Sequence, residues 1–212
     1  MKRKIRIAIP SKGRLKQPSI QMLQRADVNI LEEERAYVSK TSDPKFEAIF
    51  ARAFDVPVYV HYDAVDIGIT GHDLILEREA DVHELLDLGF GKCQLVVAVP
   101  ENSTINSIND VPAVARIATE FPNLSRKYFE GLGKQVEILG VRGTSELAPA
   151  LGLAQIIVDV SSSGETLRKN NLKVIATVLD STCRLACNKI AYRTFENEIN
   201  ELLGRLRQGG LE

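Results

Sequence analysis

The sequence predicts an α/β fold with a largely parallel sheet. Short apolar runs rich in β-branched residues alternate with helical patterns along the whole chain. No internal repeat, low-complexity tract or long linker interrupts this alternation. With 212 residues, the chain is long enough for one or two domains with a substantial hydrophobic core.

The first half of the chain contains the clearest strand candidates. Strands are expected at residues 5–10, 35–39, 46–51 and 65–70. A helix is expected at residues 18–26, and another begins near Asp55, a candidate N-cap that is followed by Pro57 in the first turn.

The second half continues the same alternation. Strands are expected at residues 95–99, 116–119, 135–139, 156–158, 174–179 and 185–189, and helices at 122–132, 143–151, 165–170 and 195–206. In the last helix Ile199, Leu202, Leu203 and Leu206 recur at helical spacing. This spacing predicts an amphipathic helix with one face on the core.

Composition and charge exclude several classes of protein. Hydrophobic residues make up 44% and charged residues 26% of the chain, as in ordinary globular proteins. The formal net charge of −1, the absence of Trp and the 6% of aromatic residues argue against a nucleic-acid-binding surface. The apolar run after the basic N-terminus is too short for a signal peptide, and no run is long enough to span a membrane. We therefore expect a cytoplasmic protein with no nucleic-acid or membrane partner.

Cysteine and histidine usage predicts neither disulfides nor a metal centre. The three cysteines, Cys93, Cys183 and Cys187, are too few and odd in number for a disulfide framework. No neighbouring Cys or His cluster completes a metal site around the Cys183–Cys187 pair. We expect buried free thiols and structural histidines.

One stretch, residues 156–167, carries the strongest functional signal. An apolar run ends at Asp159, small residues follow, and a helical pattern begins at Glu165. Backbone amides at such a strand–turn–helix junction converge on one point and favour an anion. The groups available for a phosphate belong to Ser161, Ser162, Ser163, Gly164, Glu165 and Thr166. The alternative is an N-capped turn with no ligand.

Asp159 adds a carboxylate at the expected end of this strand. There it could bind sugar hydroxyls or a metal beside the phosphate. A carboxylate that leads into a phosphate loop is the layout expected for a pentose phosphate.

Three further predicted strand ends are followed by polar, charged or glycine residues. Lys12, Gly13 and Arg14 follow the first strand, where open α/β sheets bind ligands. Arg52 follows the strand at 46–51, and Gly71 and Asp73 follow the strand at 65–70. The alternatives are a solvated basic terminus for the first loop and a plain N-capped helix for the last.

Several catalytic patterns are absent from the sequence. Neither Gly-Lys pair is followed by Ser or Thr, so there is no Walker A loop, and no Gly-x-Ser-x-Gly elbow occurs. A phosphate loop, strand-end carboxylates and loop cations suit a reaction that depends on positioning and charge. Displacement of pyrophosphate from a phosphoribosyl donor is such a reaction, in which Mg²⁺ and cationic side chains absorb the developing charge.

Several segments together resemble the ATP phosphoribosyltransferase family, which catalyses the first step of histidine biosynthesis. The matching segments extend over nearly the whole chain and lie at residues 12–15, 66–74, 85–91, 116–119, 145–149 and 158–167. The resemblance implies two α/β domains of periplasmic-binding-protein-like (type II) architecture, with the active site in the interdomain cleft. It implies a domain I of residues 1–92 plus 183–212 and a domain II of residues 93–182 that carries the phosphoribosyl-binding loop.

The resemblance also implies the reaction and its site. N1 of the adenine of ATP attacks C1 of phosphoribosyl pyrophosphate and gives phosphoribosyl-ATP and pyrophosphate. The residues implied for phosphoribosyl pyrophosphate are Asp159, Ser161, Ser162, Ser163, Gly164, Glu165 and Thr166. Those implied for ATP or pyrophosphate are Lys12, Gly13, Arg14, Arg52, Gly71, Asp73 and Glu146. Mg²⁺ would be held mainly by the substrate phosphates, and no acid or base residue is required because adenine N1 already carries a lone pair.

The end of the chain after its amphipathic helix resembles the short form of the family, which has no C-terminal regulatory domain. Short forms are similar to catalytic subunits of a hetero-octamer with a histidyl-tRNA-synthetase-like regulatory partner. Gln155, Ser161, Ser163, Phe54 and Glu120 depart from the family pattern, and the last two remove or reverse positive charge. The alternative function is a non-catalytic ligand-binding module of the same two-domain fold.

Overall fold

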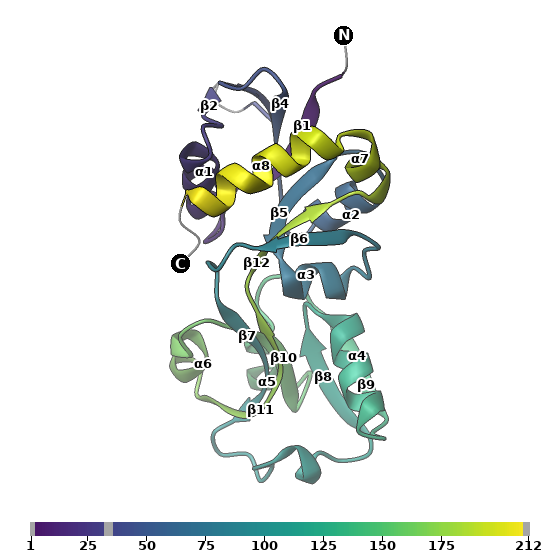
Figure 1. The fold of residues 1–212 in the computed structure, drawn as a ribbon. Coiled ribbons are helices and arrows are strands. Elements are labelled where there is room, and N and C mark those ends of the chain that lie inside the picture. The colour runs from purple at the N-terminus through teal and green to yellow at the C-terminus, as the bar shows by residue number, and fades with distance from the viewer. Residues whose placement is uncertain (1–2, 32–35, 210–212) are drawn as a thin grey trace. The chain divides into compact units, whose positions relative to one another are not determined.

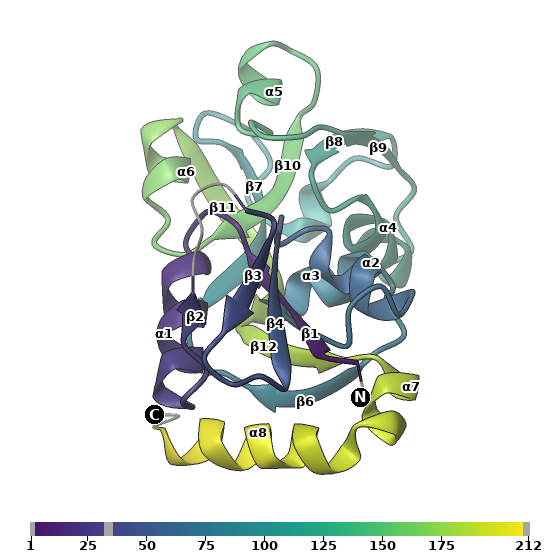
Figure 2. The same ribbon diagram turned by 90° about the horizontal axis from the view of Figure 1, so that it is seen from above.

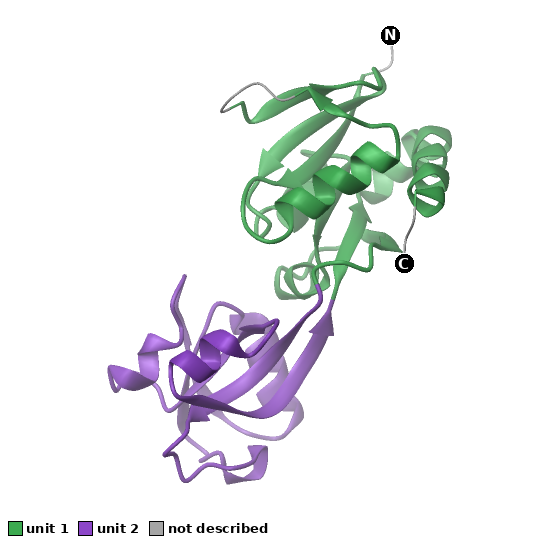
Figure 3. Ribbon diagram, turned by 90° about the vertical axis from the view of Figure 1, so that its left-hand side faces the viewer, with its two compact units in different colours: residues 1–91, 182–212 green, residues 92–181 purple. Residues whose placement is uncertain are grey.

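The computed structural model describes residues 3–31 and 36–209 of the chain. It divides into two compact units (Figure 3). Unit 1 contains residues 1–91 and 182–212, and unit 2 contains residues 92–181. Each unit is built on its own β-sheet.

The sheet of unit 1 has seven strands in the order β2-β3-β4-β1-β5-β12-β6. Their bounds are β1 (Ile5–Pro10), β2 (Ile30–Leu31), β3 (Val38–Thr41), β4 (Phe46–Ala51), β5 (Ile67–Gly71), β6 (His83–Asp87) and β12 (Cys183–Cys187). Only the centre is parallel, where β1 pairs with β4 and β5. The four remaining pairings are antiparallel.

Helices cover both faces of this sheet (Figure 1). They are α1 (Lys16–Arg25), α2 (Val56–His61), α3 (His72–Glu77), α7 (Lys189–Thr194) and α8 (Glu196–Gln208). The alternation of β1 explains the two layers, since successive side chains point to opposite faces. Ile5, Ile7 and Ile9 share a core with the apolar face of α8, whereas Ala8 packs with Val56 of α2.

The sheet of unit 2 has five strands in the order β11-β7-β10-β8-β9. Their bounds are β7 (Cys93–Pro100), β8 (Ala115–Thr119), β9 (Val136–Gly140), β10 (Ile156–Ser161) and β11 (Leu172–Ser181). The pairings of β8 with β10 and β9 are parallel, and those of β7 with β10 and β11 are antiparallel.

The helical elements of unit 2 are short except for α4. They are a 3₁₀ turn (Ile108–Asp110), α4 (Pro122–Gly131), α5 (Leu147–Ala150) and α6 (Glu165–Lys169). Figure 2 shows α5 and α6 flanking β10. Ala148 of α5 and Leu167 of α6 pack in one core cluster with Ile157 of β10, which anchors both helices to the strand that carries the candidate loop.

Several sequence expectations are wrong in detail. Both sheets are mixed rather than largely parallel, because hydrophobic alternation does not encode strand direction. The helix expected at 143–151 is only the four residues of α5, which contain Pro149. Of the strand expected at 35–39, Arg35 lies outside the described residues, and β3 begins at Val38.

The end of β12 is a further correction. The expected strand at 185–189 ends at Cys187, because the side chain of Asn188 accepts hydrogen bonds from the amides of Ile190 (2.8 Å) and Ala191 (3.0 Å). Asn188 therefore caps α7, a helix that hydrophobic periodicity does not reveal.

Candidate functional site

The loop after β10 in unit 2 is a tight turn held by its own serines. The amide of Gly164 donates to Ser161 Oγ (3.1 Å), and the amide of Glu165 donates to Ser163 Oγ (3.4 Å). Gly164 adopts φ +72°, a left-handed conformation that favours glycine. The sequence thus forms the expected strand–turn–helix junction.

The turn offers hydrogen-bond donors to the solvent. Ser162, Ser163 and Thr166 are exposed. Within residues 3–31 and 36–209, the backbone amides of Ser162 and Ser163 donate to no other group. Because α6 has only five residues, its dipole is small, and the converging amides and hydroxyls are the main groups for an anion.

Asp159 lies within β10 rather than at its end. The strand continues to Ser161, and Asp159 is paired with Val96 of β7, which corrects the expected strand end at residue 158. Both carboxylate oxygens of Asp159 accept a hydrogen bond. The amide of Val160 donates to Oδ1 (2.6 Å), and Ser145 Oγ donates to Oδ2.

The surroundings of Asp159 disfavour its charged form. Burial raises the pKa of Asp159 to about 6, although the hydrogen bonds from Ser145 and Val160 act in the opposite direction. A smaller part of this rise comes from the carboxylates of Glu146 and Glu120. Asp159 is therefore ionised at neutral pH and titrates closer to neutrality than an ordinary carboxyl group.

Glu146 belongs to unit 2, like the loop after β10. It is the residue immediately before α5, and Glu120 follows β8 and accepts a hydrogen bond from the amide of Gly143. In the described part of the chain, no group of three or more His, Cys, Asp or Glu side chains is arranged to hold a metal ion.

In unit 1, sheet register brings two cationic residues to one edge. In the parallel pair of β1 and β4, Pro10 lies opposite Ala51, and the amide of Ser11 donates to the carbonyl of Ala51 (2.7 Å). The next residues along the two strands, Lys12 and Arg52, are exposed at the carboxyl edge of the sheet. Two neighbouring parallel strands end there, which is where open α/β sheets bind ligands.

Gly13 and Arg14 complete the loop after β1. Gly13 has φ +79°, and a Cβ there would meet nothing within 4 Å, so the position requires glycine for its backbone conformation rather than for space. The Arg14 guanidinium donates to the carbonyl of Gly91 (2.9 Å). This bond ties the loop to the segment after β6.

Gly71 and Asp73 form a closed junction between β5 and α3. Gly71 is the last residue of β5, and Asp73 in the first turn of α3 is only 4% exposed. A Cβ on Gly71 would overlap Asp73 Oδ1, so the glycine leaves room for this carboxylate. The third strand end therefore presents a buried acid beside the exposed cations that follow β1 and β4.

Two features of the loops after β4 and α3 escaped sequence reasoning. The expected N-cap of α2, Asp55, makes no capping bond with its side chain. Arg78, which follows α3, lies with its guanidinium 4.5 Å from the ring centroid of Phe54 and donates from Nε to the carbonyl of Phe54 (3.1 Å). The guanidinium of Arg78 thus lies against Phe54, a position at which this sequence departs from the family pattern by loss of a positive charge.

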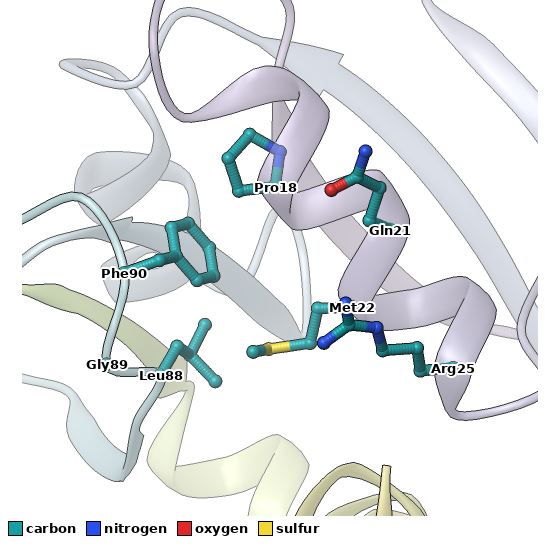
Figure 4. Close-up of a pocket in the computed structure, with 7 residues that line it drawn as sticks. All are labelled: Pro18, Gln21, Met22, Arg25, Leu88, Gly89 and Phe90. Carbon is teal, nitrogen blue, oxygen red and sulfur yellow. The ribbon is translucent and has the colours of Figure 1, made fainter. Parts of the chain in front are cut away.

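Unit 1 also contains a pocket between α1 and the segment after β6 (Figure 4). It is lined by Pro18, Gln21, Met22, Arg25, Leu88, Gly89 and Phe90. Its lining combines apolar side chains with the polar Gln21 and Arg25, and none of the site residues expected from the sequence lines it. The loops at the strand ends are a separate feature.

These observations define first a class of protein: a two-unit mixed α/β chain of the type II periplasmic-binding-protein fold. The chain is similar to the alkanesulfonate-binding protein SsuA from Xanthomonas axonopodis pv. citri, with a TM-score of 0.60 and 12% identity over 97% of this chain and 72% of that chain. At this identity the likeness shows the fold alone.

Sequence comparison then gives the family. Residues 52–208 match the ATP phosphoribosyltransferase family HisG. The chain is 45% identical to the ATP phosphoribosyltransferase of Methanothermobacter thermautotrophicus over 96% of this chain and 71% of that protein. It is 41% identical to that of Halothermothrix orenii over 95% of this chain and 92% of that protein.

A solved structure agrees with these relatives. The chain resembles one in the "ATP phosphoribosyl transferase (HisG:HisZ) complex from Thermotoga maritima", with a TM-score of 0.86 and 30% identity over 97% of this chain and 98% of that chain. The chain belongs to the ATP phosphoribosyltransferase family, which confirms the resemblance seen in the sequence. Its activity is that of a pentosyltransferase of histidine biosynthesis.

Proposed function

We propose that unit 2 binds phosphoribosyl pyrophosphate through the loop after β10. The amides of Ser162 and Ser163 and the exposed hydroxyls of the turn receive the 5-phosphate, and Asp159 accepts hydrogen bonds from the ribose hydroxyls. The observation that carries this proposal is that a half-buried, hydrogen-bonded carboxylate is followed by a turn in which the amides of Ser162 and Ser163 have no acceptor among the described residues.

Lys12, Arg14 and Arg52 of unit 1 are proposed to bind the phosphates of ATP or pyrophosphate. Support comes from the register of β1 and β4, which places Lys12 and Arg52 at one sheet edge. Gly13, Gly71 and Asp73 shape the same group of strand ends. Glu146 is proposed to act beside Asp159 in unit 2, where its charge affects that carboxyl group.

Mg²⁺ is proposed as the required cation. Mg²⁺ commonly enters such sites bound to substrate phosphates, with few protein ligands. The donors of the loop and the cations of unit 1 suit phosphate oxygens, so the chain's own groups bind the anions and the ion neutralises charge on the leaving pyrophosphate.

The chain acts by positioning and charge rather than by proton transfer. Adenine N1 carries the lone pair that forms the new bond to C1 of the ribose. Alignment of two bound substrates can lower the barrier by ~7–11 kcal/mol. Cations at the phosphates stabilise the negative charge that gathers on the leaving group.

We propose that the chain is a short-form subunit that works in the cytoplasm with a histidyl-tRNA-synthetase-like regulatory partner as a hetero-octamer. Its likeness to nearly the full length of a chain from a HisG:HisZ complex supports this assembly. The three cysteines are buried and form no disulfide, as is common in a reducing compartment.

The decisive experiment measures pyrophosphate release from ATP and phosphoribosyl pyrophosphate with Mg²⁺, by the chain alone and with the partner. Release that requires both substrates is expected, with stimulation by the partner. A folded chain that releases no pyrophosphate in either condition, yet binds a sugar or an amino acid, would instead be a ligand-binding module.

A further inference from the structure

We propose that Ser145 is a positioning residue that holds the carboxylate of Asp159 in the orientation in which it accepts the ribose hydroxyls. This inference rests on the proposed role of Asp159 in binding phosphoribosyl pyrophosphate. Ser145 precedes α5 by two positions and lies 14 residues before Asp159 in the chain. The fold alone brings the two side chains together.

The hydrogen-bond geometry supports an orienting role. Ser145 Oγ donates to Oδ2 of Asp159, and the amide of Val160 donates to Oδ1. Rotation of the carboxylate about its χ2 axis would break both bonds. A carboxylate has about four lone-pair sites, so two bonds of this kind fix the plane and still leave acceptor capacity for substrate hydroxyls.

The backbone around Ser145 is itself held in place. Ser145 has no exposed surface, and its carbonyl accepts a hydrogen bond from the amide of Ala148 (3.0 Å). Ala148 packs in the core cluster that also contains Ile157 of β10. The donor and the strand that carries the acceptor therefore share one packed core, which is the second layer of support that a preorganised site needs.

The charges near Asp159 explain why a donor is needed there. Burial is the main effect that opposes a negative charge on Asp159. Glu146, from the segment that leads into α5, and Glu120, which follows β8, add to it. The hydroxyl of Ser145 acts in the opposite direction, since it hydrogen-bonds to the ionised form. We expect loss of this donor to raise the pKa of Asp159 and so to weaken its capacity to accept hydrogen bonds at neutral pH.

The test is Ser145→Ala in the full chain, with two readouts. The first is the titration of the Asp159 carboxyl carbon by NMR with ¹³C-labelled aspartate, assigned with Asp159→Asn. We expect its midpoint to rise by about one pH unit, because a hydrogen bond to a charged group has been lost. The second is the affinity for phosphoribosyl pyrophosphate with Mg²⁺ by calorimetry at pH 8 and pH 6, which we expect to fall on the order of tenfold, and more at pH 6.

Ser125→Ala is the matched control. Ser125 is equally buried in unit 2, but its hydroxyl pairs with the neutral Thr119 Oγ1 (3.3 Å). Ser125→Ala therefore also removes a buried hydroxyl. We expect it to change neither the titration midpoint of Asp159 nor the affinity for phosphoribosyl pyrophosphate. Ser145→Thr keeps a hydroxyl at the position and should restore the wild-type midpoint wherever it folds.

The two ways of failing are distinct. An unchanged Asp159 midpoint in Ser145→Ala would overturn the positioning role. A raised midpoint with unchanged affinity for phosphoribosyl pyrophosphate would overturn the proposed role of Asp159 in binding the ribose, and the inference about Ser145 would fail with it.

Discussion

The two units present opposite charges at their candidate binding regions. In unit 1, Lys12 and Arg52 are exposed at a sheet edge where parallel strands end. In unit 2, Asp159 lies among carboxylates, beside a neutral turn of serines and a glycine. The first region attracts phosphate oxygens by charge, and the second binds by directed hydrogen bonds.

The units also differ in what positions their site residues. Register between β1 and β4 places Lys12 and Arg52 of unit 1. Both side chains reach solvent, and within residues 3–31 and 36–209 neither has a partner that defines its orientation. Local bonds among Ser145, Asp159 and Val160 place the groups of unit 2. We therefore expect substitutions in unit 2 to have larger effects and to be less sensitive to salt.

The largest effect is expected for Asp159→Asn. Hydrogen bonds to a charged group contribute about 1.5–3 kcal/mol, so kcat/KM for phosphoribosyl pyrophosphate should fall by roughly 10- to 100-fold. Steady-state kinetics at pH 8 would measure this. Asp180→Asn in the same unit, an exposed carboxylate that bonds to Gln94 (2.8 Å), is the control and should behave as wild type. Near-normal kinetics of Asp159→Asn would remove Asp159 from the site.

The ionised carboxylate of Asp159 should lower the free energy of unfolding at neutral pH. Because the pKa of Asp159 is raised to about 6 in the folded state from 3.8, the folded protein takes up this proton first as the pH falls. Wild type should therefore be less stable than Asp159→Asn at pH 8, by up to about 3 kcal/mol. The difference should shrink as the pH falls through 6 and vanish below about 4. Urea unfolding of both proteins across this range would measure it, and a difference independent of pH would contradict it.

An intermediate effect is expected for Gly164→Ala. A Cβ at Gly164 would meet nothing within 4 Å, so the substitution acts through the left-handed backbone, at a cost of about 1–2 kcal/mol. The turn should shift and affinity for phosphoribosyl pyrophosphate should fall about tenfold. Gly133→Ala, at φ +68° and equally uncrowded, matches the strain in a different loop of unit 2. Equal losses of affinity in the two variants would mean that the turn has no special role.

The smallest effect is expected for Arg52→Ala in unit 1. An exposed cation contributes at most ~1 kcal/mol to a pair with an anion, so KM for ATP should rise several-fold. Salt should reduce the difference, since exposed charges are screened within about 10 Å at 0.1 M ionic strength. Arg193→Ala, an exposed arginine of α7, is the control. A loss larger than that of Asp159→Asn would reverse the ranking of the two units.

Much of the fold could be predicted from local patterns. The strands at 5–10 and 46–51 are confirmed residue by residue, because their alternation matches the two faces of a covered sheet. Strand direction could not be predicted, since β12 pairs antiparallel with β5 and β6 after an intervening stretch of about 90 residues. The capping role of Asn188 could not be predicted either, because this residue falls inside the apolar stretch expected to be a strand at 185–189.

The candidate site divides in the same way. Turn chemistry predicted the loop around Gly164, because glycine adopts a positive φ at little cost and serine hydroxyls bond to nearby backbone amides. The contact of Ser145 with Asp159 has no signal in the sequence, since it depends on packing of α5 against β10. The same holds for Arg78 and Phe54, which meet only through the fold of unit 1.

The insertion of unit 2 between β6 and β12 determines an order of synthesis. Unit 2 is one continuous segment, so every strand of its sheet has been made by Ser181. Unit 1 remains incomplete at that moment, because β12, which separates β5 from β6, and the core-covering α8 come last. We expect unit 2 to be protected from proteolysis early on the ribosome, and unit 1 to close only after residue 208 has emerged. Refolding in vitro should be slowed by the same long-range pairing.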